Sequence, residues 1–458
     1  NRANHRKLNS EECCLLIDEM ASAIVSGSIR RCLPEYALVH SKKGLVPIKD
    51  VEVGEEVQTP LGYRKVLNKF DQGEQEVFDI LSNGPTTKAT INHRVAVLED
   101  ALGGYSWKKV SDLKEGDRLL HNKTPLSGLP TQLPKDFTTE RPFKSNNSKD
   151  ITIPLLTPDI AWLIGFTHGD GYVSLGRNKD NKPYGCVTWT TDENIAEEIE
   201  LKLNSALAQF NLTAKRSTFK NEKTNRFVCN SIRLAEYFYK FIKQPNTTIE
   251  IPKFILQGSI EVRSSYLAGV IDSDGAVDNR PPYLVTSVYP EFVRQVSATL
   301  SSLGIPGRIS TYTPKEENWK KKWNIKLVSF KQAYNNYVAP HSVKGKIFVP
   351  PRTHHSFSIP QEMVKEQYSY TEIRSMGFSA TSTQNSNCNS EHYFEETGVD
   401  MDIPITFSGL GNSQTVRTFD IEVEDAHCFY CDGYLTHNSA GMRQFDKSES
   451  LLKKNLWQ

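Results

Sequence analysis

The sequence predicts a multidomain protein in which an all-β domain is interrupted by an α+β domain with an internal pseudo-two-fold repeat. Three observations lead to this fold class. Short runs rich in β-branched residues, separated by Gly and Pro turns, fill residues 32–122 and return near the C-terminal end. Mixed helical and strand patterns occupy 151–370 between them. Within this middle region two sequence blocks recur in the same order, which indicates a duplicated unit.

The composition is that of a globular protein of two or three domains. The chain has 458 residues, of which 38% are hydrophobic, and a net charge of +1, so any nucleic-acid surface would be local. Eight cysteines without a regular framework indicate a reducing compartment. The sequence has no apolar signal core and no apolar run of about 20 residues. We expect a soluble, cytoplasmic monomer without a membrane partner, and a fragment rather than a secreted precursor.

Changes of pattern along the chain suggest its boundaries. The N-terminal segment has helical spacing in CCLLIDEMASAIV, and the β pattern begins after Arg31. Polar connectors at 124–150 and 379–392 are typical of domain boundaries. We therefore expect flanking segments at 1–31 and 439–458, an all-β domain formed by 32–125 and 395–438, linkers at 126–154 and 371–394, and the α+β domain at 155–370.

The start of the all-β domain carries residues suited to cleaving a peptide bond of the chain itself. The Cys32 thiol can attack the carbonyl of Arg31 and form a thioester, if another group protonates the amide nitrogen. Thr90 and His93, in TINH, supply a hydroxyl and an imidazole three residues apart. These three residues form a candidate N-terminal reaction site.

The end of the same domain offers a second reaction. The side-chain amide of Asn438 can attack its own backbone carbonyl and close a five-membered imide, which a held turn favours. His437 is placed to protonate the leaving amine, and Ser439 supplies a hydroxyl beyond the same bond. A lone Cys, a T-x-x-H and a His-Asn-Ser tripeptide each occur commonly without a function. Their order, at points where the sequence pattern changes, favours the catalytic interpretation.

Residues 32–438 resemble an intein, an element that excises itself from a host protein. CLPEYALV is similar to the N-terminal splicing block, TINHRVAV to the T-x-x-H block, and RTFDIEVEDAHCFYCDGYLTHN to the two C-terminal blocks. The resemblance implies a horseshoe-shaped all-β splicing (Hint) domain that ligates Arg31 to Ser439 without a cofactor. It also implies that Asp420 steers the transesterification and that His427 assists imide formation.

The flanking sequences VSGSIRR and SAGMRQF resemble an adenosylcobalamin-dependent ribonucleotide reductase. The resemblance implies that host-protein fragments lie on both sides of the excised element.

The two recurring blocks of the middle domain are AWLIGFTHGDGYV and SYLAGVIDSDGAV. Thr157 is suited to cap a helix that ends at Asp170, and Ser259 is suited to cap one that ends at Asp274. Small residues four apart clear one face of each helix, so that two such faces can pack closely; they are Gly165, Gly169, Gly269 and Ser273.

Close packing of these helices would bring Asp170 and Asp274 together at two helix C-termini. Adjacent carboxylates are unfavourable there unless divalent cations bridge them. Both residues are therefore candidate metal ligands and catalytic residues, for Mg²⁺ or another divalent cation and phosphodiester hydrolysis. Ordinary core helices with capping turns are the alternative.

The blocks resemble the LAGLIDADG homing endonucleases, over about residues 155–370. The resemblance implies cleavage of double-stranded DNA at the insertion site. The first block departs from the family in carrying His168 where an acid is usual, and Glu250 stands where the family often has a lysine. Lys253 is displaced from that position, and Lys344 or Lys346 could serve the other half. A domain that binds DNA without cleaving it is thus the main alternative.

Basic residues follow each block, where strands could read a DNA groove and hold phosphates. The candidates are Arg177, Lys179, Lys182, Lys215, Arg216, Lys220, Lys223, Arg226, Arg308, Lys320, Lys321, Lys322 and Lys326. Such charge runs are commonly just solvated surface.

Cys428 and Cys431 form a C-x-x-C beside His427. A zinc site would need a second ligand pair, which the sequence does not offer. A redox pair that switches splicing off is one interpretation, and incidental free thiols are the favoured one.

Overall fold

The computed structural model describes residues 31–137, 150–177, 179, 181, 183–218, 224–245, 247–277, 281–314, 320–346, 357–378 and 387–438. The helix expected before Arg31 lies outside these residues. So do Ser439, Lys182, Lys220 and Lys223.

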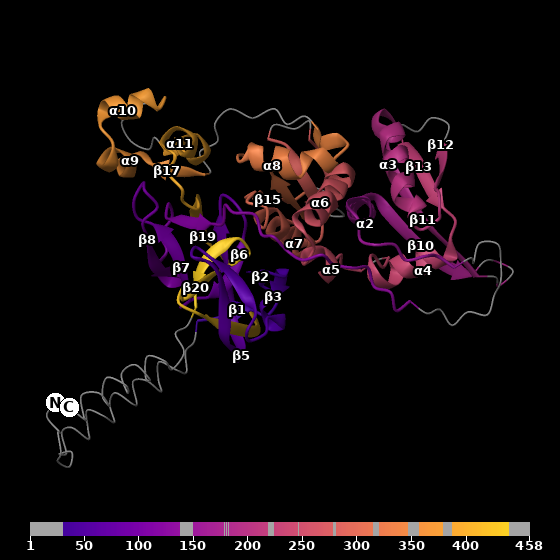
Figure 1. Cartoon of the computed structure of the whole chain (residues 1–458), viewed down its shortest axis with the longest axis horizontal. Coiled ribbons are helices and arrows are strands. Elements are labelled where there is room, and N and C mark those ends of the chain that lie inside the picture. Colours follow the sequence, from indigo (N-terminus) through magenta and orange to yellow (C-terminus); the bar gives the residue numbers. More distant parts are fainter. Residues whose placement is uncertain are drawn as a thin grey trace, which may run out of the picture.

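A 12-stranded antiparallel sheet forms the β domain and takes its strands from both ends of the described chain (Figure 1). The first part supplies β1 Leu33–Pro34, β2 Leu38–Ser41, β3 Gly44–Pro47, β4 Glu56–Thr59, β5 Gly62–Ser82, β6 Thr87–Thr90, β7 Arg94–Leu98, β8 Tyr105–Lys109 and β9 Arg118–His121. The last part supplies β19 Ile403–Val423, β20 Cys428–Cys431 and β21 Tyr434–His437. Short 3-10 turns η1 Ile48–Asp50 and η2 Val110–Asp112 connect some of these strands.

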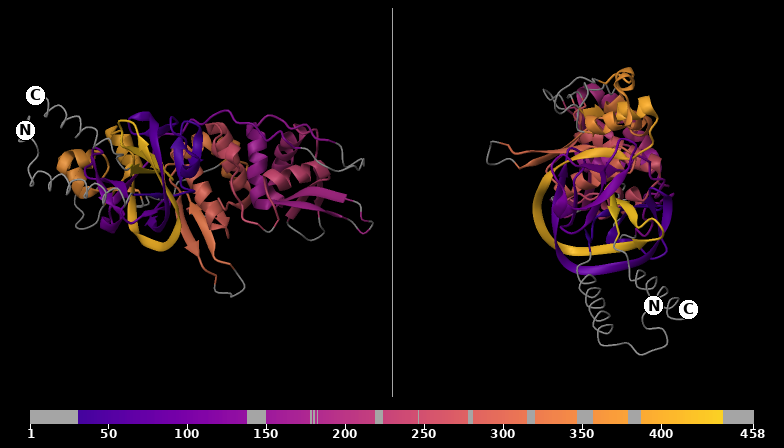
Figure 2. Two further views of the ribbon diagram at one scale, coloured as in Figure 1. Left: turned by 90° about the horizontal axis from the view of Figure 1, so that it is seen from below. Right: turned by 90° about the vertical axis from the view of Figure 1, so that its left-hand side faces the viewer.

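The long strands β5 and β19 shape this domain. They pair with each other along most of their length, and the N-terminal end of β19 also pairs with β9. Four register shifts interrupt the β5–β19 ladder, and such irregularities bend a strand. Figure 2 shows β19, in yellow, arching around the domain as a result. Its two ends are buried while its middle is largely exposed.

The α+β domain is built around α2 Pro158–Asp170 and α6 Ile260–Asp274. Its first half contains β10 Gly171–Arg177, β11 Pro183–Asp192, η4 Glu193–Ile195, α3 Ala196–Ala208, β12 Lys215–Thr218, β13 Thr224–Cys229 and α4 Ile232–Phe241. After α5 Lys253–Leu256, the second half contains β14 Tyr283–Ser287, α7 Pro290–Ser301, β15 Arg308–Tyr312, β16 Lys322–Lys326, α8 Lys331–Tyr337, η5 Ala339–His341 and η6 Lys344–Lys346. Each half therefore repeats a central helix, a small antiparallel sheet and covering helices.

The predicted ends of the central helices are confirmed. The Thr157 hydroxyl accepts a hydrogen bond from the Ile160 amide, and the Ser259 hydroxyl accepts one from the Val262 amide. The two helices end at Asp170 and Asp274.

A small third unit packs on the β domain (Figure 1). It contains β17 Ser358–Pro360, α9 Gln361–Gln367, α10 Tyr370–Ser375, β18 Asn387–Asn389 and α11 Ser390–Thr397. The segment expected as a linker at 371–394 thus holds parts of this unit, because apolar residues such as Ile373 and Tyr393 are buried in a core shared with Leu98 and Leu120. The other expected linker, 126–154, begins with Leu126 buried in the core of the α+β domain. Within the described residues, no helix is long and apolar enough to cross a membrane.

Candidate functional sites

The first candidate site surrounds the Arg31–Cys32 peptide bond. Cys32 is fully buried, and its amide nitrogen donates to the Thr90 hydroxyl over 3.0 Å. The backbone amide of Thr90 donates to the Cys32 carbonyl over 3.0 Å. This pairing holds β6 against the start of the β domain, so Thr90 lies directly on the nitrogen that thioester formation would release. The side-chain nitrogen of Gln75, on β5, lies 3.9 Å from the Cys32 sulfur, a contact that no sequence motif indicated.

His93 connects this bond to the C-terminal strand. Its amide donates to the Thr90 carbonyl over 2.9 Å, and its Nε2 contacts the hydroxyl of Thr436 on β21. Burial lowers the pKa of His93 to about 3, against a smaller opposing effect of the Arg31 backbone. The imidazole is therefore neutral, and it lies between the two ends of the domain.

Asp420 is also buried close to this bond. Its carboxylate accepts a hydrogen bond from the Ile421 amide over 2.9 Å, and its charge raises the pKa of Arg31 against the larger lowering by burial. The long β5–β19 ladder places it, since Asp420 pairs with Phe70.

The second candidate site surrounds Asn438, at the end of β21. Its amide nitrogen donates to the His427 carbonyl over 3.1 Å, and the residue is fully buried. The Asn438 side-chain amide is oriented so that its nitrogen faces an acceptor and its oxygen faces a donor. Nδ2 then donates to the His427 carbonyl over 2.5 Å, and Oδ1 accepts from the Val423 amide over 2.7 Å. These bonds immobilise the side chain whose nitrogen would attack the adjacent carbonyl.

His437 lies against the carbonyl that would be attacked, because its Nδ1 contacts the backbone oxygen of Asn438. Burial lowers the pKa of His437, the Asn438 carbonyl raises it, and the charges of Arg31 and His427 lower it further. Trp107 on β8 packs edge-on against the ring at 4.8 Å between centroids, another contact without a sequence signal. His93, which bonds to Thr90 and contacts Thr436, brings both ends of the domain into one region.

The C-x-x-C motif does not form a paired site. Cys428 and Cys431 are the two ends of β20, and both are free, buried thiols. Alternation along the strand puts Cys428 in the core shared with the third unit and Cys431 in the core of the β domain. Because the side chains point to opposite faces, the redox-pair and zinc interpretations lose their geometric basis.

The third candidate site lies where α2 and α6 end together. A Cβ added at Gly165 would lie 2.1 Å from the Tyr266 carbonyl oxygen, and one at Gly269 would lie 2.1 Å from that of Trp162. Only glycine permits this approach, so the predicted close packing of the two helices is confirmed.

Asp170 and Asp274 are electrostatically coupled at these helix ends. Burial, followed by the charge of Asp170, raises the pKa of Asp274 to about 7. Burial also raises the pKa of Asp170. Charged carboxylates are thus disfavoured here unless a cation compensates them. In the described part of the chain no group of three His, Cys, Asp or Glu side chains could hold a metal. A cation at this pair would therefore complete its shell with backbone oxygens, water or phosphate, as Mg²⁺ commonly does.

Two lysines occupy equivalent positions at this site. Lys243 Nζ donates to the carbonyls of Thr167, His168, Gly169 and Gly171 at 2.7–3.1 Å. Lys344 Nζ donates to the carbonyl of Ser273 over 3.0 Å. Each lysine therefore lies at the negative end of one central helix. Burial lowers the pKa of Lys243 to about 8, and the charges of Asp274 and Asp170 act in the opposite direction.

Lys243 is a lysine at this site that the sequence comparison at Glu250 does not indicate. Glu250 is exposed, and Lys253 pairs with Asp50 of the β domain over 2.7 Å, so neither occupies the site. The site lysine is instead supplied seven positions before Glu250, immediately after α4, where no motif indicated it. The alternative lysine, Lys344, does reach the second half of the site, whereas the side chain of Lys346 lies outside the description.

His168 and Asp272 hold equivalent positions in the two blocks and anchor these lysines differently. Asp272 accepts hydrogen bonds from the amides of Val343 and Lys344, each at 2.9 Å. His168 Nε2 instead lies 2.9 Å from the carbonyl of Ile242, next to Lys243. A carboxylate accepts from amides, while an imidazole N–H can donate to a carbonyl. Although the first block carries His168 in place of an acid, the segment that holds Lys243 is therefore still fixed by a hydrogen bond.

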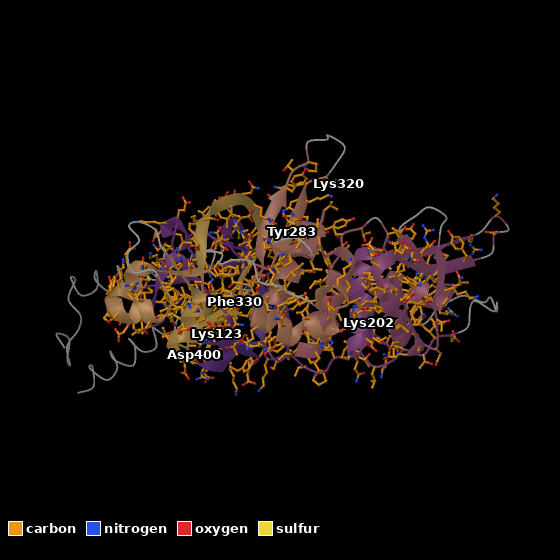
Figure 3. The ribbon with its side chains drawn as sticks, turned by 90° about the horizontal axis from the view of Figure 1, so that it is seen from above. Lys123, Lys202, Tyr283, Lys320, Phe330 and Asp400 are labelled. Atoms are coloured by element: carbon orange, nitrogen blue, oxygen red, sulfur yellow. The ribbon has the colours of Figure 1, made fainter. Side chains whose placement is uncertain are left out.

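The two small sheets each present one face away from the helices. Ile325 of β16 is buried beneath the helices, whereas Lys322, Asn324 and Lys326 alternate with it on the opposite face. Arg308 and Tyr312 of β15 pair with two of them. The β15–β16 hairpin projects from the body of the molecule (Figure 2). Figure 3 shows Lys320 near its tip and Tyr283 closer to its base.

The first sheet has a similar open face, which includes Arg226, Lys215 and Thr190. Arg216 does not join it, because this residue pairs with buried Phe227 and its guanidinium lies 3.4 Å from Glu200. Arg177 lies exposed at the end of β10 and donates to the Asn181 carbonyl. The remaining expected DNA contacts are Lys179, beyond β10, and Lys321, whose ammonium lies over the Trp323 ring.

Comparison with known proteins supports a nuclease domain. Residues 250–346 match the family model described as homing endonuclease. The ribonucleoside-diphosphate reductase NrdEB subunit alpha of Bacillus subtilis (strain 168) is 26% identical over 163 residues, which are 32% of this chain and 14% of that protein. A DNA polymerase of Thermococcus sp. (strain GE8) is 24% identical over 282 residues, 61% of this chain and 14% of that protein. The chain thus spans a small part of the length of these relatives.

Solved structures of a homing endonuclease and of an intein show weaker, partial likeness. Mesophilic variants of the homing endonuclease I-DmoI align with a TM-score of 0.33 and 16% identity over 41% of this chain and 98% of that chain. I-DmoI in complex with DNA and Mn aligns with a TM-score of 0.32 and 17% identity, over 40% and 97%. The gp41-1 intein aligns with a TM-score of 0.17 and 24% identity, over 20% and 68%.

Proposed function

We propose that this chain is a self-splicing element that carries a DNA-cleaving homing endonuclease domain. The observation that supports splicing most strongly is His93, whose backbone and ring link the Arg31–Cys32 bond to the strand that ends at Asn438. One neutral imidazole between two reactive peptide bonds is an arrangement suited to coordinated acyl transfer.

Splicing would begin at Cys32. Its sulfur attacks the Arg31 carbonyl carbon, the Arg31–Cys32 C–N bond breaks, and the thiol proton passes to the released amine. Thr90, already bonded to this nitrogen, aligns it, and His93 relays the proton. The Ser439 hydroxyl then displaces the Cys32 sulfur, with Asp420 close enough to steer this transfer.

Asn438 would complete the excision. Its Nδ2 attacks its own backbone carbonyl carbon, the Asn438–Ser439 bond breaks, and the leaving nitrogen takes a proton. His437 Nδ1 contacts the oxygen on which negative charge develops, so it stabilises this step directly. The His427 carbonyl orients the attacking amide. The freed Ser439 amine finally attacks the ester, which joins Arg31 to Ser439 through an ordinary peptide bond.

In the nuclease domain, Asp170 and Asp274 would hold Mg²⁺ or another divalent cation, which supplies an activated water and charge compensation for phosphodiester hydrolysis. Lys243 and Lys344 neutralise the helix C-termini beside this pair and are placed to approach a DNA phosphate. The open faces of the two sheets would bind the duplex, with Arg226, Lys322 and Lys326 among the contacts. The position of Lys243 supports cleavage over the alternative of a domain that binds DNA without cleaving it.

The flanks would then belong to a host protein of the ribonucleotide reductase class, and its gene without the insert would be the DNA target. Both activities can be tested on one preparation. Intact mass spectrometry should show excised 32–438 and a ligated peptide of 1–31 joined to 439–458. A duplex encoding the joined flanks should be cut in Mg²⁺. Loss of ligation in Cys32→Ala would support the assigned chemistry, whereas a ligated product from that variant would refute it.

A further inference from the structure

We infer that the nuclease domain holds the C-terminal splice junction in place through Arg294 on α7, a positioning residue for the reaction at Asn438. This inference rests on the proposed splicing function. It concerns the β20–β21 hairpin, residues 428–437, which we call the junction hairpin. One end of this hairpin carries the reacting residues, and the other end touches the nuclease domain.

The two ends of the junction hairpin are well defined. At the open end Cys428 pairs with His437, and the Asn438 amide bonds to the His427 carbonyl. At the closed end Asp432 and Gly433 form the turn, with φ values of 48° and 93°. A turn with two positive φ values matches the twist of its strands. The strands between these ends have four residues each, so movement of the turn is transmitted to the junction over a short distance.

The Asp432 carboxylate fixes the turn against three other segments. It accepts hydrogen bonds from the Leu38 amide and the Thr87 hydroxyl, both at 3.1 Å, and from Arg294 Nη1 at 2.8 Å. Asp432 is only 3% exposed. A carboxylate buried to this extent needs a charged partner, because hydrogen bonds to neutral groups do not fully replace its hydration.

Arg294 is the cation that meets this need, and it belongs to the nuclease domain. Its guanidinium also donates to the Tyr36 carbonyl over 3.0 Å and to Glu291 on its own helix over 2.7 Å. Burial opposes its charge, but the charges of Asp432 and Glu291 outweigh this and raise its pKa. A planar guanidinium can bridge these groups at once, whereas a lysine ammonium could not span them.

The rest of α7 reinforces the contact. Ser301 Oγ, at the end of the helix, lies 2.8 Å from Nε2 of buried His121. A Cβ added at Gly433 would lie 2.7 Å from the Ser301 Cβ, so helix and turn are closely packed. α7 also packs against β14 and β16, the sheet whose open face carries Lys322 and Lys326. A single helix therefore lies between the candidate DNA surface and the junction hairpin.

Loss of Arg294 would leave Asp432 buried without a charged partner, and the turn would relax toward solvent. β21 would shift with it, and the contacts of His437 and Asn438 with the scissile carbonyl would loosen. Small misplacements of this kind cost about 10²-fold in rate when a reaction depends on a held conformation. Tyr36 and Thr87 also contact the Arg294–Asp432 pair, but β1 and Thr90 are held in addition by β19 and β5, so the reaction at Cys32 should suffer less.

The first test measures hydrogen exchange in the full chain with Cys32→Ala and Asn438→Ala, so that no cleavage occurs. Arg294→Met should speed exchange of the Tyr434–His437 amides by about tenfold or more through local opening. The matched control is Arg233→Met, which removes another largely buried arginine of the nuclease domain, on α4. Unchanged exchange in Arg294→Met, or an equal rise in the control, would overturn the inference.

The second test measures the rate of C-terminal cleavage in a Cys32→Ala background. Arg294→Met should slow it by about 10- to 100-fold, and thiol-induced cleavage at Cys32 in an Asn438→Ala background should change much less. Adding Asp432→Asn to Arg294→Met should recover part of the rate, because the unpaired charge is then absent. Equal losses at both junctions would indicate general destabilisation and refute the positioning role. A different outcome would separate the two proposals. If the parent chain does not splice but Arg294→Met still speeds hydrogen exchange in the junction hairpin, splicing is refuted and the structural link between Arg294 and the hairpin stands.

Discussion

The region around Cys32 and Asn438, which we propose as the splice centre, and the region around Asp170 and Asp274, which we propose as the nuclease centre, differ in how many of their reactive groups are hydrogen-bonded within the chain. At the proposed splice centre, the Cys32 amide donates a hydrogen bond to the Thr90 hydroxyl, and the Asn438 amide donates one to the His427 carbonyl. The His93 ring is neutral. At the proposed nuclease centre, burial and the charge of Asp170 disfavour the charged form of Asp274 at the end of α6. Strand pairing positions the groups of the first centre, whereas under the proposed function the second would be completed by a cation and a DNA phosphate.

Buried histidines and buried carboxylates make the free energy of unfolding depend on pH with opposite signs. Buried histidines of the β domain have lowered pKa values, so the stability they contribute is lost as pH falls. Asp274 has a pKa raised to about 7, so its contribution is present at low pH and is lost as pH rises through that value.

Asn438→Ala should reduce C-terminal cleavage to below detection, because no other side chain can form the imide. Thioester formation at Cys32 should persist and be visible as cleavage by added thiol. The measurement is intact mass over time. Release of the C-terminal flank from this variant would show that another group performs the reaction.

Asp170→Asn and Asp274→Asn should each lower DNA cleavage by about 10³-fold, because the carboxylate pair loses a cation ligand. Splicing should be unchanged in both variants. Cleavage of the joined-flank duplex would be followed on a gel, with splicing followed in the same sample. A parallel loss of splicing would show that the two centres are not separate.

Lys243→Met should slow DNA cleavage by about 10²-fold, since its ammonium lies against the carbonyls at the end of α2. Lys253→Met is the matched control: it breaks a largely exposed ion pair with Asp50 and should leave cleavage within about twofold. Equal effects of the two substitutions would remove Lys243 from the site.

Acidification from pH 6.5 to pH 5.5 should destabilise the β domain. His40, His93 and His121 are fully buried, and burial lowers their pKa values to about 4, 3 and 3. The unfolded chain takes up protons in this window and the folded chain does not, so each histidine costs about 1 kcal/mol of stability between the two pH values. Urea unfolding at both pH values would measure the loss, and His40→Gln should reduce it by about one third. An equal free energy of unfolding at both pH values would show that these histidines are not buried in their neutral form.

Oxidation of Cys428 and Cys431 should have the smallest effect, because the two thiols lie in different cores. Splicing of the Cys428→Ala/Cys431→Ala variant in glutathione buffers should match that of the parent within about twofold at each redox ratio. Redox sensitivity that disappears in the variant would show that the thiols do meet.

Several features of both centres could be predicted from the sequence because they depend on local chemistry. The caps at Thr157 and Ser259, the helix ends at Asp170 and Asp274, and the glycine contact between α2 and α6 follow from residue type and spacing. These are short-range rules, and the structure confirms them.

Other features depend on contacts between segments far apart in the sequence. Gln75 and Trp107 reach the splice centre because β5 and β8 pair with particular partners, and Lys243 reaches the nuclease centre through the loop after α4. The sequence does not predict the third unit: 358–370 is assigned to the α+β domain and 371–394 to a linker, because the short helices are separated by polar sequence. In each case the register of a strand or the path of a loop determines which residues meet, and neither can be read from the neighbouring sequence.

Splicing and DNA cleavage can be measured together on the purified chain. One sample contains a chelator and the other Mg²⁺, both contain the duplex that encodes the joined flanks, and splicing is measured by intact mass. We expect excised 32–438 and the ligated flanks to form at the same rate in both samples, while the duplex is cut only in Mg²⁺. A chain that remains full length, or one that splices only when Mg²⁺ is present, would contradict the claim that the splice centre is complete within the chain.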